Sequence, residues 1–175
     1  MALAHPAARR TAGYTLTEVM LTVAILGIVA SMAPSLLLQM NRFFRQNNAR
    51  VAIQREAREA LDLINRNLRQ AQASTVVVDQ VAGEFPHSRI VFTRLTPSGS
   101  TVSMSFYQQG SSLFMVRGTS AARALSKNLR YLGFSYPRTD DAKLISVSLT
   151  TEAGTFQGQT KALQLSVEKV RIMND

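Results

Sequence analysis

The feature that most limits the fold of this chain is a long uncharged stretch near its start. No Asp, Glu, Lys or Arg occurs between Glu18 and Arg42, and the twenty residues from Val19 to Leu38 are mostly aliphatic. A bilayer core about 30 Å thick is crossed by roughly 20 helical residues. The stretch therefore predicts a membrane-spanning helix. A buried core helix is the alternative, but soluble helices of this length normally carry a polar face.

Residues 1–13 precede this stretch and have the composition of a targeting leader. They read MALAHPAARRTAG, with Arg9 and Arg10 just before the apolar run. Such a segment is set aside when the fold is considered. A secretory signal cut after residues 31–33 is the alternative, and it would release a soluble domain. Pro34 directly after that position and Glu18 inside the segment argue against it.

Beyond the apolar run the helical pattern continues but becomes one-sided. No Gly or Pro occurs from Ser35 to Ala73. A single helix from about Tyr14 to Ala73 is expected, about 90 Å long. Apolar residues in its second half recur at steps of three and four, which predicts a buried stripe. The stripe comprises Ile53, Ala57, Ala60, Leu61, Ile64, Leu68 and Ala71.

Two residues in the apolar half predict a weak point in this helix. Pro34 has no backbone N–H and crowds the carbonyl of Ala30, so a kink or local unwinding is expected. Gly27 weakens the same region. Both residues are tolerated in membrane helices, and the alternative is a flexible joint used when the helix packs against its neighbours.

From Ser74 the pattern changes to short β-branched runs. Val102, Met104 and Phe106 alternate with Ser, as expected for a sheet with one dry and one wet face. The runs follow one another without long helices, so the sheet should be mainly antiparallel. Residues 121–127 fit either a helical turn or a loop. The predicted strands are 75–78, 89–95, 101–107, 112–117, 129–136, 143–150 and 162–170.

The expected fold is α+β, because the helical stripe and the dry face of the sheet each need a cover. A long amino-terminal helix, membrane-embedded in its first half and amphipathic in its second, should pack on a mainly antiparallel β-sheet domain. The expected divisions are 1–13 leader, 14–40 membrane helix, 41–73 amphipathic continuation and 74–175 β-rich domain.

Composition excludes several classes of function. There is no Cys and only two His, so disulfides, thiolate chemistry and histidine metal clusters have no residues to form them. Asp140 and Asp141 offer too few oxygens for calcium. No nucleophile with its base and no phosphate-binding glycine loop is found in 74–175, so we expect no enzyme, no cofactor and no small-molecule substrate. The net charge of +9 suggests an anionic partner or a solvated basic surface, and its distribution favours the latter. No aromatic residue follows Phe44 among the arginines of 42–69, so nucleic-acid binding is not expected.

The hexapeptide Gly13-Tyr14-Thr15-Leu16-Thr17-Glu18 lies where the leader meets the apolar run. It resembles the prepilin processing motif, in which Gly is followed by Phe, Thr, Leu, any residue and Glu; Tyr14 replaces the usual Phe. The chain thus resembles type IV pilins and type II secretion pseudopilins. The resemblance implies a pilin-like fold in which 14–40 forms the filament core. It also implies that a prepilin peptidase cuts between Gly13 and Tyr14 and methylates the new amine of Tyr14.

Glu18 has a chemical reason to stand at this place. A carboxylate at the edge of a membrane span is costly, so a partner is expected. Cleavage after Gly13 gives Tyr14 a free amine one helical turn away from Glu18, and a negative charge in the first turn also suits the helix dipole. By resemblance, Glu18 of an incoming subunit meets the amino terminus of a neighbour, which makes it a filament-assembly residue.

The resemblance implies a single-pass protein of the inner membrane, with its globular domain on the periplasmic side until it enters a filament. Its partners would be the peptidase, other pilin or pseudopilin subunits, the inner-membrane assembly platform and lipid. The stretches 54–71 and 125–138 are similar to J-type minor pseudopilins and W-type minor pilins, which implies a subunit of the initiating tip complex. A DNA-uptake or adhesive minor pilin is the alternative.

The distribution of positive charge conflicts with this orientation. The rule that positive flanks stay inside counts two arginines before the span and more after it, which favours the reverse topology. The flanking arginines are Arg9 and Arg10 before the span and Arg42, Arg45, Arg50, Arg55 and Arg58 after it. The processing motif is given precedence, because the peptidase acts on the cytoplasmic side.

Overall fold

The computed structural model describes residues 13–96, 99–156 and 160–174. The chain divides into two compact units, one ending at Asn41 and the other running from Arg42 to Asp175. Helix α1 (Leu16–Leu68) contributes residues to both, so each unit is described by itself. Residues 1–12, which hold nearly all of the predicted leader, lie outside the described residues.

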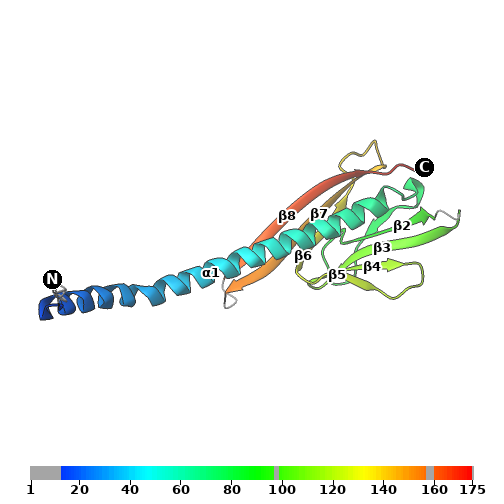
Figure 1. The fold of residues 1–175 in the computed structure, drawn as a ribbon. Helices are drawn as coiled ribbons and strands as arrows, with labels where there is room; N and C mark the ends of the chain where they lie inside the picture. Colours follow the sequence, from blue (N-terminus) through cyan, green and yellow to red (C-terminus); the bar gives the residue numbers. More distant parts are fainter. Residues whose placement is uncertain (1–12, 97–98, 157–159, 175) are drawn as a thin grey trace, which may run out of the picture. The chain divides into compact units, whose positions relative to one another are not determined.

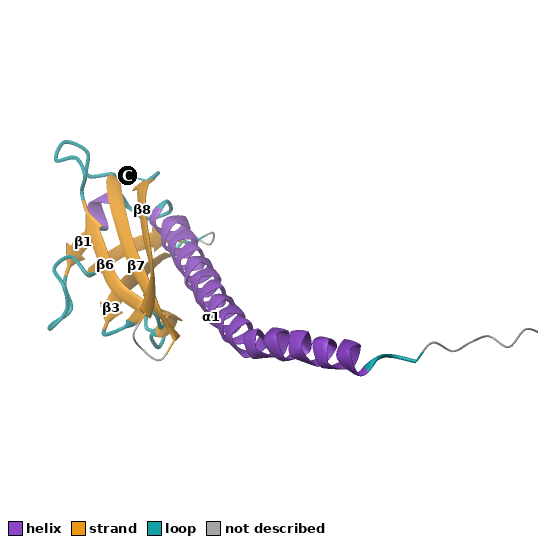
Figure 2. Cartoon of the chain, turned by 90° about the vertical axis from the view of Figure 1, so that its left-hand side faces the viewer, coloured by secondary structure: helices purple, strands orange, loops and turns teal. Residues whose placement is uncertain are grey.

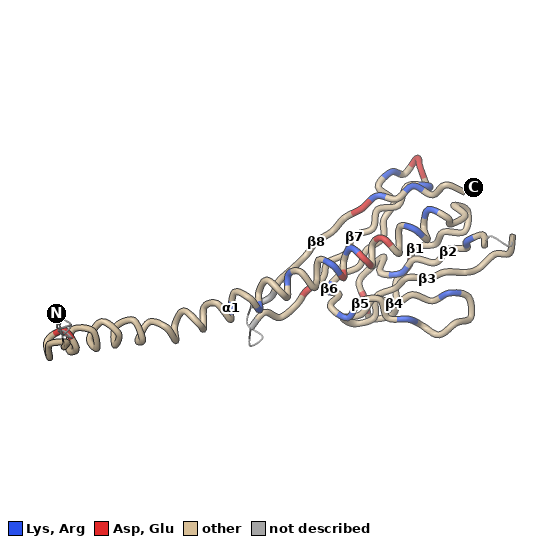
Figure 3. The backbone as a smooth tube through the Cα atoms, in the orientation of Figure 1, with Lys and Arg blue, Asp and Glu red and all other residues tan. Residues whose placement is uncertain are grey.

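The first unit contains the apolar part of α1. Every described residue from Gly13 to Asn41 is exposed, including aliphatic side chains such as Leu26 and Leu37, each 65% exposed. Among the described residues, α1 is the one helix long and apolar enough to cross a membrane. In Figure 3 the amino-terminal part of α1 is a long stretch without Lys, Arg, Asp or Glu, as the sequence from Val19 to Asn41 requires. An apolar surface that its own chain leaves bare needs lipid or other protein chains around it.

The second unit combines the rest of α1 with two β-sheets (Figures 1 and 2). Every strand pairing is antiparallel. The five-stranded sheet has the order β1 (Val77–Asp79), β2 (Arg89–Leu95), β3 (Thr101–Gln109), β4 (Ser112–Arg117) and β5 (Arg123–Ser126). The three-stranded sheet has the order β6 (Leu129–Ser135), β7 (Leu144–Phe156) and β8 (Thr160–Arg171). The predicted α+β, pilin-like class is confirmed, although the division into two sheets was not predicted.

The predicted helical stripe forms the centre of the core of the second unit. All seven predicted positions are buried, at 3% exposure or less. Six of them, all except Ile53, pack in one cluster with side chains from both sheets, among them Phe92, Phe106, Phe134 and Val147. The rings of Phe92 and Phe106 stack with centroids 6.1 Å apart. Burying each large side chain of this kind contributes about 1.5–3 kcal/mol, so the stripe anchors the second part of α1 to the sheets.

The helix ends earlier than the sequence predicts. It stops at Leu68 rather than near Ala73, and residues Ala73–Thr75 form a short 3-10 turn. The N–H of Ala71 bonds to Leu68 O in a tightened last turn, and the N–H of Gln72 then donates to Thr93 O of β2 at 2.9 Å. Because no local breaker stands here, pairing with a distant strand ends the helix.

The prediction for residues 121–127 was wrong. A helical turn or a loop was expected, but Arg123–Ser126 form strand β5, which pairs with β4. The Ala-rich sequence favours a helix locally, and the free edge of β4 overrides that preference. β7 also runs to Phe156, beyond the predicted end at residue 150, so β7 and β8 form a long hairpin.

Candidate processing and assembly site

The start of α1 is closed by a reciprocal pair of hydrogen bonds between Thr15 and Glu18. The N–H of Thr15 donates to Glu18 Oε2 at 3.0 Å, and the N–H of Glu18 donates to Thr15 Oγ1 at 3.3 Å. The Thr15 hydroxyl also donates to Glu18 Oε2 at 3.2 Å. This arrangement is a capping box, which satisfies backbone donors that a helix otherwise leaves open.

The predicted cleavage site lies just outside this cap. Gly13 and Tyr14 precede the helix in irregular backbone, and Tyr14 is 86% exposed. Both residues lie outside the helix, and cleavage of the bond between them stays a prediction. The helix itself begins at Leu16, two residues later than predicted.

Tyr14 and Glu18 lie around the same surface hollow. The hollow has a volume of about 410 Å³ and is lined by Tyr14, Glu18, Val19, Leu21 and Thr22. The carboxylate of Glu18 already accepts the N–H of Thr15, which is the residue next to the nitrogen that cleavage would free. A new positive charge on Tyr14 would therefore arise beside an oriented carboxylate at the positive end of the helix.

The three hydroxyl side chains between Val19 and Leu38 are all bonded to carbonyls of their own helix. Thr22, Ser31 and Ser35 donate to the carbonyls of Val19, Ile28 and Met32 at 2.8, 2.7 and 2.8 Å. Such back-bonding removes the cost of placing a hydroxyl in a medium without water. The segment can therefore be surrounded by lipid or by other apolar helices without leaving these side chains unsatisfied.

Gly27 and Pro34, the predicted weak point, both lie inside α1 and are exposed. The helix is continuous through both residues. Pro34 cannot donate to the carbonyl of Ala30, so one rung of the helical ladder is missing there. A functional joint at this place stays a prediction.

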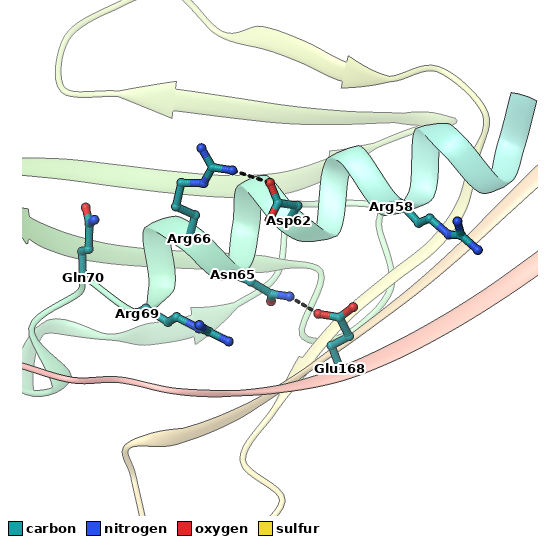
Figure 4. A pocket seen from close by; sticks show the side chains of 7 residues that line it. All are labelled: Arg58, Asp62, Asn65, Arg66, Arg69, Gln70 and Glu168. Atoms are coloured by element: carbon teal, nitrogen blue, oxygen red, sulfur yellow. Dashed lines mark hydrogen bonds and ion pairs between the residues drawn. The ribbon is translucent and has the colours of Figure 1, made fainter.

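A second feature is an open cleft between α1 and β8, shown in Figure 4, with a volume of about 400 Å³. Asp62 accepts a hydrogen bond from Arg66 at 2.6 Å, and Asn65 donates to Glu168 of β8. None of its described lining residues is aromatic, so bases would find no surface for stacking here. The lining consists of Arg58, Asp62, Asn65, Arg66, Arg69, Gln70 and Glu168.

Two polar contacts that the sequence did not reveal hold α1 to the rest of the second unit. The carboxylate of Glu56 accepts the N–H of Lys127 at 2.8 Å and Asn128 Nδ2 at 2.7 Å. Partial burial disfavours the charged form of Glu56, but these hydrogen bonds outweigh it and lower the pKa of the carboxyl. Asn67, which is buried, accepts a hydrogen bond from Arg94 at 2.7 Å.

Metal chemistry has no candidate residues in the part of the chain that the structure describes. No three His, Cys, Asp or Glu side chains group there in a way that could hold an ion.

Comparison with known proteins agrees with the geometry of the helix start. Residues 8–34 match the family described as the prokaryotic N-terminal methylation motif. No curated protein and no solved structure matches the chain. The motif supports a type IV pilin-like family and a pilin or pseudopilin subunit. It implies processing by a prepilin peptidase and assembly with other pilin subunits. Together with the apolar helix, it suggests anchoring in the inner membrane and incorporation into a pilus.

Proposed function

We propose that this chain is a minor structural subunit of a type II secretion pseudopilus or a type IV pilus, and that it acts in the complex that initiates the filament at its tip. The observation that carries the proposal is the start of α1. A processing motif, an oriented carboxylate and a fully exposed apolar helix follow one another within residues 8–41. A helix of this kind is stable in lipid before assembly and among other such helices afterwards.

In this proposal Gly13 and Tyr14 are the cleavage site, Tyr14 is the methylated residue and Glu18 pairs with the amino terminus of a neighbouring subunit. Gly27 and Pro34 form the joint that lets the helix adapt from bilayer to filament. The globular unit faces the periplasm or the cell exterior. The assembly platform of the inner membrane is the remaining partner, and this chain is a substrate of the peptidase and has no catalytic role of its own.

The minor role rests on the similarity of 54–71 and 125–138 to J-type pseudopilins and W-type minor pilins. The described lining of the cleft between α1 and β8 has no aromatic ring on which bases could stack. DNA uptake is therefore less favoured than a role in starting the filament.

One experiment tests the proposal as a whole. The protein is extracted from membranes of its own cells, and its intact mass is measured beside its abundance in sheared filaments. We expect loss of residues 1–13, one added methyl group and a low abundance relative to the major subunit. A chain that keeps its leader in working filaments, or one that begins at Pro34, would contradict it.

A further inference from the structure

Strand β8 exposes a stripe of apolar side chains in the second unit. Leu163, Leu165 and Val167 are 59%, 65% and 55% exposed. Alternate residues of a strand point to the same side of the sheet, so the three side chains form one continuous surface. We call this surface the β8 stripe.

The alternation over the central residues of β8 is the reverse of what its own fold requires. On β7, Ile145, Val147 and Leu149 face the core and are fully buried. The β8 residues paired with two of them are polar: Glu168 lies opposite Val147 and Ser166 opposite Leu149. At these central positions β8 turns polar side chains towards α1 and its apolar ones away, whereas Ala162 and Val170 nearer its ends are buried. Folding of the single chain does not explain this pattern, since it leaves the apolar half in water.

Because β8 is an edge strand, its exposed apolar stripe favours unwanted association with other chains. β8 is at one edge of its sheet, next to β7 alone. A long edge strand with an apolar face invites unwanted pairing, and natural proteins normally shorten, charge or cover such an edge. β8 is neither short nor charged over its central residues. A partner that covers the β8 stripe in the assembled state would explain why this edge strand carries exposed apolar side chains.

The charged residues on the same face of the sheet indicate the chemistry of the partner that would bind there. The alternation continues from Val167 to Lys169 and Arg171, which are exposed. On β7, Glu152 lies opposite Leu163, and its carboxylate accepts a hydrogen bond from Arg130 at 2.5 Å. Among the described residues this face thus offers an apolar stripe beside cations, while its one carboxylate on β7 is engaged.

We propose that the β8 stripe, with Lys169 and Arg171, is the docking surface for a different subunit of the same filament, one that presents an apolar patch next to Asp or Glu side chains. This inference rests on the proposed function and adds the surface and the chemistry of the partner. A complementary pattern of this kind fixes the register of two surfaces and selects between partners.

Two other occupants fit less well. A second copy would bring its own cations to this face, and the chain carries a net charge of +9. A bilayer lying over the stripe would also cover Ser148 and Thr150, which stand opposite Val167 and Leu165 on β7, and the ion pair of Glu152. Removing these polar groups from water is costly.

The absence of cysteine from the chain gives a direct test. In the full chain, expressed in its own cells, Leu165→Cys is labelled with a benzophenone maleimide, and isolated membranes are illuminated. The cross-linked product is digested and identified by mass spectrometry. Thr101→Cys, at an exposed position at the start of β3, is the matched control. We expect an adduct from position 165 with a second chain that carries the N-terminal methylation motif and an acidic surface.

A charge reversal sharpens this test. Lys169→Glu combined with Arg171→Glu should lower the yield of that adduct at least about fivefold, since two exposed ion pairs are lost. Arg117→Glu, at an exposed position of β4, should leave the yield unchanged. An adduct only with a second copy, only with lipid, or in equal yield from position 101 would overturn the proposal, as would no adduct.

The two proposals fail in distinguishable ways. If the unmodified chain keeps its leader and stays out of filaments, the proposed function fails. If it is processed and incorporated but position 165 gives no adduct with an acidic subunit, the docking surface alone is wrong.

Discussion

Thr15 and Glu18 hold each other in place at the first turn of α1: the N–H of Thr15 donates to Glu18 Oε2 at 3.0 Å, and the N–H of Glu18 donates to Thr15 Oγ1 at 3.3 Å. The carboxylate is thus turned back towards the chain end where cleavage would create an amine. Thr15 acts here as a positioning residue for Glu18. The hydrogen bonds that cap the helix also orient the Glu18 carboxylate, which in our proposal pairs with the amino terminus of a neighbouring subunit.

Replacing Thr15 by Val should loosen the start of α1. Loss of a capping hydroxyl costs about 1 kcal/mol, so amide exchange over Leu16–Val19 should quicken about fivefold. The measurement is hydrogen exchange of the full chain in detergent micelles. Thr22→Val is the control, because its hydroxyl bonds to Val19 O within the helix and makes no cap. Equal exchange in the two variants would refute the capping role.

Replacing Glu18 by Gln should separate processing from assembly. The amide can still accept the N–H of Thr15, but it carries no charge to meet an amine. We expect normal leader removal and a fall of at least about tenfold in the share of the chain found in sheared filaments. Glu18→Asp should retain part of this share. If Glu18→Gln enters filaments as well as the unchanged protein, charge pairing is not the basis of assembly.

Replacing Pro34 by Ala should stiffen the apolar part of α1. Ala supplies the N–H that the carbonyl of Ala30 lacks, so amide exchange over residues 35–38, which can be followed in both chains, should slow. Met32→Ala changes the side-chain surface without changing the backbone ladder and serves as the control. Unchanged exchange in the Pro34 variant would argue that no weak point exists there.

Replacing Glu56 by Gln should destabilise the second unit in a pH-dependent way. The pKa of Glu56 is lower in the folded chain, so its contribution is present above the unfolded pKa and is lost as pH falls through the folded one. We expect a cost of about 1 kcal/mol at pH 7, modest because the group is partly exposed. The difference from the unchanged chain should vanish in acid, as measured by denaturant unfolding.

Glu59→Gln is the control for this variant. Its exposed pair with Arg55, one turn away, should contribute almost nothing. A pH-independent cost for Glu56→Gln would show that shape, not charge, matters at that position.

Replacing Ile64 by Ala should test the buried stripe. Ile64 of α1 is fully buried in the core cluster, and a cavity of this kind costs about 2–5 kcal/mol. Val51→Ala, at a position of α1 that is 64% exposed, should change the free energy of unfolding by less than about 0.5 kcal/mol. Similar values for the two variants would mean that the stripe does not anchor the helix.

Much of the candidate site could be predicted from local sequence. The uncharged run after Glu18 and the processing motif are properties of neighbouring residues, and the structure leaves the run exposed as a membrane helix requires. The cap was not predicted, although Thr15 and Glu18 have the spacing of a capping box. The contacts of Glu56 and Asn67 could not be predicted either, since their partners lie far away in the sequence.

The sequence by itself determined the helix, its apolar half and the stripe that faces the sheets, because periodicity and composition act over a few turns of one chain. Tertiary structure decided where α1 stops, that residues 123–126 become a strand, and which face of β8 is left bare. Each of these depends on backbone pairing between distant segments. Local preference cannot specify such pairing, because the partner strand supplies the free energy that selects the conformation.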